Sequence, residues 1–317
     1  MTNRTESTVG VDAIAFSGPA SFLALEDLAT ARHVNPDKYL IGLGQHKMSI
    51  ASPCEDTVTL AVAAGKKALD TFAIDPASIG TLIVGTETGV DHSKPVAVYV
   101  HELLGLDQNC RTFETKHACL GATAGLTTSI DWIVSGRARG KKALVIAADI
   151  ANYGAHTAGE PTQGAGAVAM VISASPRLLD IHTQHIGDYT KQVMDFWRPL
   201  YSQHPIVDGH FSIDCYLEAL TQARQTALSD TPSSPNLHAW LYHVPFVKMA
   251  KKAHQRELEL TLRRQLNTDD ASDKQILSES YNRLTAPYLT LNAQVGNIYT
   301  GSLFLSLIDW LRQSSAS

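Results

Sequence analysis

The sequence predicts an α/β fold in which a mostly parallel sheet is covered by helices on both faces. Residues 81–86 and 143–148 form short, continuously apolar runs, which are typical of strands buried on both faces. Segments with apolar residues at helical spacing lie between such runs. Strands that alternate with helices along a chain favour parallel strands joined by helical crossovers.

In the first half of the chain the order of elements is regular. The apolar runs predict strands at 11–17, 81–86, 110–114, 143–148 and 165–172. Amphipathic patterns predict helices at 24–33, 55–69, 94–104 and 122–134. Ser52-Pro53 opens the second of these helices, and Gly136 follows the last one, as start and stop signals do.

The second half is less regular. We expect a strand at 180–187, a polar and aromatic insertion around 195–209, a helix at 212–228 and a strand at 237–243. Further helices are expected at 249–266, after the polar break at 269–273, and at 298–311. Two halves of related layout, 1–175 and 176–317, are the predicted domains, although no internal sequence repeat is strong enough to prove their relation.

Composition excludes several classes of protein. The chain has 317 residues, 44 % of them hydrophobic, which can bury one large core or two ordinary ones. A net charge of −5 does not favour a nucleic-acid partner. No apolar run reaches the roughly 18–20 residues of a membrane helix, and the polar residues 1–10 do not resemble a signal peptide. Four widely spaced cysteines without a Cys-x-x-Cys pair indicate a reduced, cytoplasmic protein without a metal site.

Cys119 is the first candidate for chemistry. It lies among small residues just before the helix expected at 122–134. The positive end of a helix favours the thiolate, which is the reactive form of cysteine. Considered by itself, however, this segment also fits a small buried cysteine with no catalytic role.

Five runs carry a family resemblance because they occur in one order: TETGVD (86–91), FETKHACLGAT (113–123), GEPTQGAGA (159–167), YHVPF (242–246) and VGNIYTG (295–301). Together they resemble hydroxymethylglutaryl-CoA synthases of the bacterial mevalonate type, within the thiolase superfamily. The resemblance covers about 11–311 and implies a thiolase-like fold of two related βαβαβ halves, layered α-β-α-β-α. It also implies a homodimer that uses acetyl-CoA and acetoacetyl-CoA as substrates and needs no cofactor.

The resemblance assigns three catalytic residues. Cys119 would carry the acetyl group as a thioester, and Glu87 would remove a proton from its methyl group. The resulting carbanion would add to the ketone of acetoacetyl-CoA, with His243 assisting the forming alkoxide. From the residues alone, Glu87 is equally well a helix cap or an ion-pair partner, and His243 an ordinary histidine at a strand end.

Substrate-binding positions follow from the same resemblance. Asn297 would donate to an acyl oxygen, and Thr162 and Ser212 would contact the ligand, although each also fits turn or cap chemistry. Lys248, Lys251 and Lys252 begin the helix that follows His243, where cations oppose the helix dipole unless an anion such as the CoA phosphates is bound. Lys252 matches the family's CoA-contacting lysine best, and Lys248 is second.

Some features depart from the family. Asn35 stands where Asp is more usual, and His117 stands where Glu or Gln is expected. The chain also stops soon after 298–311, whereas the family continues for about seventy residues, including a Ser-Tyr-Gly-Ser-Gly turn on the closing strands. We therefore expect a shortened form whose second half lacks its closing strands. Two alternatives remain: a polyketide β-branching enzyme acting on carrier-protein-bound acceptors, and a shortened, non-catalytic or subunit-like chain.

Overall fold

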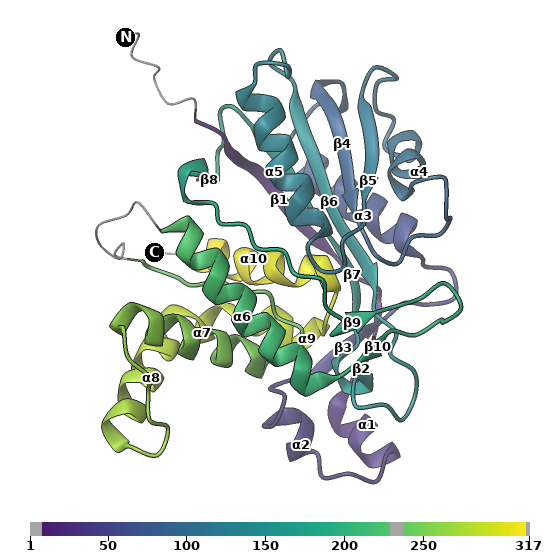
Figure 1. The fold of residues 1–317 in the computed structure, drawn as a ribbon. Helices are drawn as coiled ribbons and strands as arrows, with labels where there is room; N and C mark the ends of the chain where they lie inside the picture. Colours follow the sequence, from purple (N-terminus) through teal and green to yellow (C-terminus); the bar gives the residue numbers. More distant parts are fainter. Residues whose placement is uncertain (1–7, 229–236, 315–317) are drawn as a thin grey trace, which may run out of the picture.

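A six-stranded sheet forms the centre of the molecule (Figure 1). The computed structural model describes residues 8–228 and 237–314. The strand order is β5-β4-β6-β7-β1-β8. The strands are β1 (Gly10–Ser17), β4 (Ile79–Gly85), β5 (Arg111–Thr115), β6 (Lys142–Ile150), β7 (Ala165–Ser173) and β8 (Leu179–Asp180). The five strands predicted in the first half are therefore confirmed, with boundaries shifted by at most two residues.

The prediction of a mostly parallel sheet is wrong. β4 pairs in parallel with β5 and β6, but β7 runs antiparallel to both β6 and β1, and β8 is antiparallel to β1. The connection from β6 to β7 is a loop and not a helical crossover, so the chain reverses direction there. Continuous apolar runs reflect burial on both faces, and this sheet has such burial whichever way its strands run.

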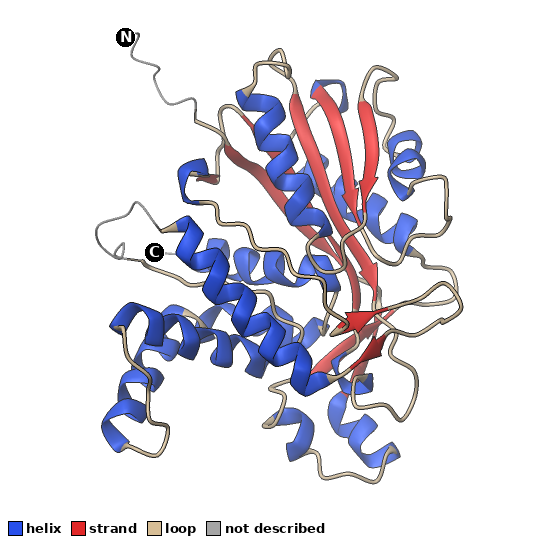
Figure 2. Cartoon of the chain, viewed as in Figure 1, coloured by secondary structure: helices blue, strands red, loops and turns tan. Residues whose placement is uncertain are grey.

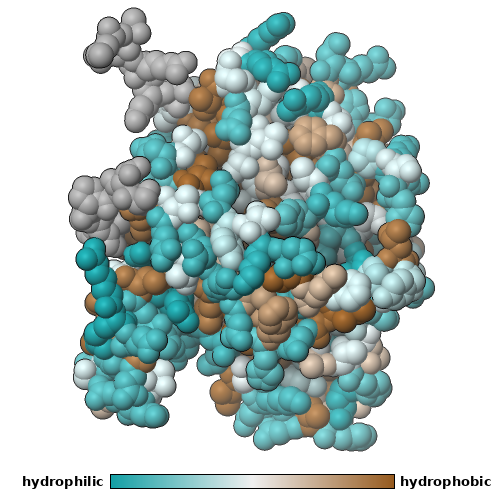
Figure 3. All heavy atoms as spheres, in the orientation of Figure 1, coloured by the Kyte–Doolittle hydropathy of each residue, from teal (hydrophilic) through white to brown (hydrophobic). Residues whose placement is uncertain are grey.

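Two pairs of helices cover the two faces of this sheet. α3 (Thr57–Thr71) and α4 (Val96–Leu103) pack on the face that carries Leu82, Val84 and Leu144. α5 (Gly121–Val134) and α10 (Ser302–Ser314) pack on the other face, which carries Ala143 and Val145. Alternate residues of one strand thus enter different cores, as the period of a strand requires. On the face drawn in Figure 3, apolar side chains form scattered groups among hydrophilic ones.

Local signals explain where these helices begin. α3 begins at Thr57 because Asp56 caps it: the Asp56 carboxylate accepts from the Thr59 main-chain N–H at 2.8 Å, and the Thr59 hydroxyl accepts from the Asp56 N–H at 2.8 Å. α5 has no such side-chain cap of its own. The Thr300 hydroxyl, which comes from the end of the chain, instead accepts from the Ala122 N–H at 2.7 Å. The start of α5 is therefore held by a distant segment.

The second half, as far as it is described, is mainly helical (Figure 2). Its helices include α6 (Gly209–Ala227), α7 (Val247–Leu262), α8 (Ala271–Leu284) and α9 (Thr290–Val295). The strand predicted at 180–187 is reduced to the two residues of β8, and no strand forms at 237–243. Among the described residues no strand lies beside residues 241–244, so this segment has no strand with which to form hydrogen bonds. A layered second sheet is therefore not formed within 179–228 and 237–314.

Several smaller elements were not predicted. β2 (Ser21–Ala24) pairs antiparallel with β3 (Lys47–Ile50), and β9 (Phe196–Trp197) pairs antiparallel with β10 (Ile206–Val207). The short helix α2 (Asp37–Leu40) was not predicted either, whereas α1 (Leu25–Ala31) confirms the helix predicted at 24–33. Residues 231–235, whose Pro and Ser content predicts a loop, lie outside the described residues.

Candidate active site

Parallel strand ends and one helix start converge at the candidate site. Glu87 follows β4 by two residues, and the turn that carries Cys119 follows the adjacent parallel strand β5. Carboxyl ends of parallel strands meet at one edge of a sheet, where ligands commonly bind in α/β proteins. Close packing fixes this arrangement, because a Cβ added to Gly85 would lie 2.2 Å from the main-chain nitrogen of Ala122 in α5. Only glycine permits the strand and the helix to approach so closely.

Cys119 contacts Glu87 directly. The Cys119 sulfur lies 3.9 Å from Oε1 of Glu87 and points its thiol toward that carboxyl group. Cys119 lies in a tight turn in which the Leu120 N–H donates to the His117 carbonyl at 2.8 Å. Ala118, the preceding residue, has φ = +37°, a strained value for a residue with a side chain. The backbone is therefore held in an unusual conformation beside the sulfur.

The thiol of Cys119 is protonated at rest, contrary to the sequence prediction. Burial raises the pKa of Cys119 well above its ordinary value, and the Glu87 and Asp149 carboxylates raise it further. The positive end of a helix was expected to favour the thiolate. α5 begins only at Gly121, however, and burial together with two neighbouring carboxylates raises the pKa of the Cys119 thiol instead. The nucleophile must lose its proton during the reaction, and Glu87 is the group in contact with it.

Glu87 has the properties of a base near neutral pH. Burial, followed by the charge of Asp149, raises the pKa of Glu87 to about 8, while the Arg198 cation opposes this increase. A raised pKa increases the proton affinity of the carboxylate and so improves a carboxyl group as a general base. The sequence prediction placed Glu87 at the end of a buried strand, and the structure confirms that position.

Asp149 organises the residues around Glu87 and was not predicted. It is fully buried at the end of β6, and its Oδ1 accepts from the Thr86 hydroxyl at 2.8 Å and the Glu87 N–H at 2.9 Å. The same oxygen accepts from the N–H and hydroxyl of Thr88 at 3.1 and 2.7 Å. Burial raises the pKa of Asp149 to about 6. A polar residue directly after the apolar run at 143–148, on the strand beside β4, was the signal that could have identified it.

His243 lines the same cavity as Cys119. The cavity has a volume of about 550 Å³ and is lined by Cys119, His243, Asn297, Thr162 and Ser212 among other residues. The Tyr216 hydroxyl of α6 donates to the His243 carbonyl at 2.9 Å, and the two rings are stacked with centroids 6.4 Å apart. Burial lowers the pKa of His243 to about 4, so its imidazole is neutral at physiological pH. A neutral imidazole can still donate one hydrogen bond.

The predicted binding residues divide into two groups. Asn297 and Thr162 are adjacent, since the Asn297 N–H donates to the Thr162 carbonyl at 2.9 Å. The hydroxyls of Thr162 and Ser212 donate to the carbonyls of Gly159 and Asp195, both at 2.8 Å, so both also hold the cavity wall. Lys248 and Lys252 do not line the cavity, although Met249 of the same helix does. Their predicted role toward CoA therefore concerns a part of the ligand outside this cavity.

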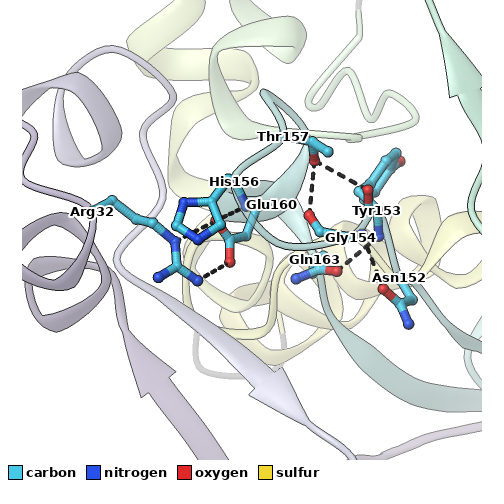
Figure 4. Close-up of polar contacts among 8 residues, drawn as sticks. All are labelled: Arg32, Asn152, Tyr153, Gly154, His156, Thr157, Glu160 and Gln163. Atoms are coloured by element: carbon cyan, nitrogen blue, oxygen red, sulfur yellow. Dashed lines mark hydrogen bonds and ion pairs between the residues drawn. The ribbon is translucent and has the colours of Figure 1, made fainter.

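The loop from β6 to β7 forms one wall and is shown in Figure 4. Arg32 reaches it from the end of α1, and its guanidinium donates to the Glu160 carboxylate at 2.8 and 2.5 Å. The same carboxylate accepts from the His156 N–H at 3.0 Å. Tyr153, a cavity residue that was not predicted, is held by its N–H, which donates to Oε1 of Gln163 at 2.8 Å.

No group of three or more His, Cys, Asp or Glu side chains suited to a metal ion occurs in residues 8–228 and 237–314. Within the same described ranges, no helix is both long and apolar enough to cross a membrane.

Comparison with known proteins adds independent findings. Residues 5–176 match the family described as "Hydroxymethylglutaryl-coenzyme A synthase N terminal", and residues 179–274 match its C-terminal counterpart. The chain is 37 % identical over 313 residues to the hydroxymethylglutaryl-CoA synthase of Enterococcus faecalis, covering 97 % of this chain and 76 % of that protein. It is 33 % identical to the human mitochondrial enzyme over 349 residues, covering 97 % and 68 %.

Solved structures are similar as well. The structure of MvaS in complex with 3-hydroxy-3-methylglutaryl coenzyme A superposes with a TM-score of 0.91 at 43 % identity, covering 98 % of this chain and 78 % of the other. The curacin biosynthetic pathway HMG synthase in complex with acetyl donor-ACP superposes with a TM-score of 0.88 at 32 % identity, covering 95 % and 73 %. The predicted thiolase-like α/β fold is confirmed by these superpositions.

Proposed function

The chain belongs to the hydroxymethylglutaryl-CoA synthase family, and we propose that it condenses acetyl-CoA with acetoacetyl-CoA through an acetyl group held on Cys119. The product is hydroxymethylglutaryl-CoA, an intermediate of the mevalonate pathway. The observation that carries this proposal is the contact of 3.9 Å between the Cys119 sulfur and the Glu87 carboxyl group, at a cavity that also receives His243.

In the first step, the Cys119 sulfur attacks the acetyl carbon, and the bond from that carbon to the CoA sulfur breaks. The thiol proton passes to Glu87 and from there to the departing CoA thiolate. Because the thiol is protonated at rest, a base must take up its proton, and the carboxyl group of Glu87 lies within contact distance of the sulfur.

In the second step, the Glu87 carboxylate removes a proton from the methyl group of acetyl-Cys119. The carbanion forms a carbon–carbon bond with the ketone carbon of acetoacetyl-CoA, and the ketone oxygen gains negative charge. The neutral imidazole of His243 donates a hydrogen bond to this oxygen and stabilises its charge, and the proton that Glu87 removed from the methyl group then neutralises the alkoxide. Water finally cleaves the thioester to Cys119 and releases hydroxymethylglutaryl-CoA.

The environment of the cavity supports the choice of a thioester substrate. Its walls include the aromatic side chains of Tyr153, Phe196 and Tyr216, which exclude water from the reactive carbanion. Asn297 places an amide in the same wall, where we propose that it binds an acyl oxygen. We further propose that Lys248 and Lys252 bind the phosphates of CoA beyond the cavity.

We also propose a homodimer in the cytoplasm. β5 is the outermost strand of the six-stranded sheet and has one unpaired edge among the described residues, which a second copy could cover. The cysteines Cys54, Cys110, Cys119 and Cys215 are all free thiols, the form maintained in a reducing compartment.

Two measurements on the same preparation test the proposal. The protein is incubated with labelled acetyl-CoA, and acetylation of the peptide that carries Cys119 is measured by mass spectrometry. Acetoacetyl-CoA is then added, and hydroxymethylglutaryl-CoA is quantified. A folded chain that is not acetylated would contradict the proposal and favour the non-catalytic alternative.

A second candidate is condensation on a carrier protein. It is favoured by similarity to the curacin pathway enzyme, whose structure includes acetyl donor-ACP. Replacing acetyl-CoA by an acetylated carrier protein, and acetoacetyl-CoA by its carrier-bound form, separates the two candidates. Faster condensation with the carrier-bound substrates would favour the polyketide function.

A further inference from the structure

Both main-chain polar groups of Glu87 are held by side chains from distant parts of the chain. The N–H of Glu87 donates to Asp149 at 2.9 Å, across a sequence separation of 62 residues. The carbonyl of Glu87 accepts from the guanidinium of Arg198, 111 residues away. Hydrogen bonds on both sides of one residue restrict its φ and ψ angles, so the direction of the Glu87 side chain is fixed between Asp149 and Arg198.

Arg198 comes from the insertion that forms part of the cavity wall. It follows β9 directly, and Asp195 and Phe196 of the same segment line the cavity. The Phe196 ring packs against Tyr153 and Tyr299, with centroids 6.3 and 5.6 Å apart, which anchors this segment beside the site.

Two side chains of opposite charge act on the Glu87 carboxyl group. Asp149 at the end of β6 contributes a carboxylate, whereas Arg198 contributes a cation. The other titratable groups that face Glu87 are the Cys119 thiol and the phenols of Tyr153 and Tyr299. These three groups have raised pKa values and are neutral at physiological pH. Arg198 is therefore the cation among the described residues that offsets Asp149.

We propose that Arg198 is a positioning residue that holds Glu87 toward Cys119 and stabilises the ionised form of its carboxyl group. This inference rests on the role proposed for Glu87 as the base. It links the cavity wall to the base, because the segment that bounds the ligand also carries the cation that favours the ionised form of Glu87. Arg198 does not contact the reacting atoms and acts through Glu87.

Three substitutions of Arg198 distinguish the effect of its hydrogen bond to the Glu87 carbonyl from the effect of its charge on the Glu87 carboxyl group. Arg198→Met removes both the donor and the charge, Arg198→Gln keeps a donor, and Arg198→Lys keeps the charge. Arg283→Met, at an exposed position of α8, is the control for loss of an arginine elsewhere. The rate of condensation at saturating substrate is measured against pH for each protein, and acetylation of Cys119 is measured separately.

We expect Arg198→Met to lower the condensation rate about 10- to 100-fold and to move the midpoint of its pH dependence upward by about one unit. Arg198→Gln should show the same alkaline shift with a smaller loss of rate. Arg198→Lys should keep the midpoint of the unsubstituted protein, as should Arg283→Met. If all three Arg198 variants lose rate with an unchanged midpoint, Arg198 only supports the wall and the inference is overturned.

A readout that does not depend on turnover keeps this inference separate from the proposed function. The Glu87 carboxyl carbon is titrated by NMR in protein labelled with carbon-13 glutamate and is assigned by its loss in Glu87→Gln. An upward shift of its midpoint in Arg198→Met supports the inference even if the chain forms no hydroxymethylglutaryl-CoA. Coincident titrations in the two proteins would overturn the inference even if condensation is observed.

Discussion

The Cys119 sulfur lies 3.9 Å from a Glu87 carboxyl oxygen, close enough for a proton to pass between the two groups. The Glu87 carboxylate raises the pKa of the thiol, while burial and Asp149 bring the pKa of Glu87 to about 8. Below about pH 8 both groups are therefore largely protonated at rest, and Glu87 loses its proton first as the pH rises.

Replacing Cys119 by Ser should abolish acetylation of the chain by acetyl-CoA. A serine hydroxyl is a much weaker nucleophile than a thiolate toward a thioester, and its pKa is far above that of Glu87. The measurement is the mass increase of the protein on incubation with acetyl-CoA. Cys54→Ser is the matched control, because Cys54 is exposed and lies outside the cavity. Acetylation of Cys119→Ser at the rate of the control would contradict the assignment of the nucleophile.

Replacing Glu87 by Gln should separate the two chemical steps. The amide removes a negative charge beside the sulfur, so the pKa of Cys119 falls and its alkylation by iodoacetamide at fixed pH becomes faster. Acetylation should persist, because the lower pKa of Cys119 lets water take the thiol proton, whereas condensation should fall about 10²- to 10⁴-fold because the base for the methyl proton is missing. Equal loss of acetylation and condensation would show that Glu87 is not specific to carbanion formation.

Condensation should increase with pH through the titration of Glu87. A base must be deprotonated to act, and the pKa of Glu87 is about 8, so the rate should rise between about pH 6 and pH 9. His243 has a pKa of about 4 and stays neutral over this range, so it should add no further transition there. The pH dependence of the rate at saturating substrate is the measurement. A rate that is already maximal at pH 6 would contradict the raised pKa of Glu87.

Glu87 should also make the folded protein less stable as the pH rises. Its pKa is higher in the folded chain than the ordinary 4.5, so its contribution to stability is present below that value and is lost as the pH approaches about 8. Compared with Glu87→Gln, the unsubstituted protein should lose about 2 kcal/mol of unfolding free energy over this range, a value reduced for the partial exposure of the carboxyl group. Urea unfolding of both proteins at several pH values gives the comparison, and parallel curves would argue against the shift.

Much of this arrangement could be predicted from the sequence, and the reasons for the failures are physical. Apolar periodicity located the strands that end at Glu87 and precede Cys119, because burial leaves a local pattern. It did not give strand direction: β7 is as apolar as a parallel strand, yet it is antiparallel to β6. Whether residues 237–243 form a strand depends on a neighbouring strand, which no local pattern can supply.

Electrostatic relationships were harder to predict than positions. The direction of the Cys119 shift depends on Glu87 and Asp149, which lie 32 and 30 residues away along the chain and become neighbours only after folding. Arg198 lies in a segment that the sequence identified only as a polar and aromatic insertion. Its contact with the Glu87 carbonyl spans 111 residues and leaves no periodic signal.

Breaking the ion pair between Arg32 and Glu160 should destabilise the loop from β6 to β7. The side chains of Arg32 and Glu160 are only 24 % and 8 % exposed, so Arg32→Met leaves a largely buried carboxylate without its cation. We expect a measurable loss of unfolding free energy in urea unfolding, and a smaller loss when Glu160→Met is added. Lys66→Met breaks the ion pair with Asp70, whose two side chains are 69 % and 63 % exposed. It should change the free energy of unfolding by less than about 0.5 kcal/mol. Equal effects at the two sites would mean that burial does not strengthen the first pair.

Adding a single methyl group at Gly85 should separate Cys119 from Glu87. The Cβ of Gly85→Ala would lie 2.2 Å from the Ala122 nitrogen and 2.6 Å from the Gly121 carbonyl carbon, both main-chain atoms that cannot rotate away. The start of α5 must therefore shift from the end of β4, at a cost of about 1–3 kcal/mol or more in unfolding free energy. Gly209→Ala is the control for stability, since no atom lies within 4 Å of its added Cβ. If the variant remains folded, alkylation of Cys119 should lose its dependence on Glu87, so that Gly85→Ala and Gly85→Ala/Glu87→Gln react at the same rate. A variant as stable as Gly209→Ala, with the Glu87 dependence intact, would show that this close approach does not hold the two catalytic groups together.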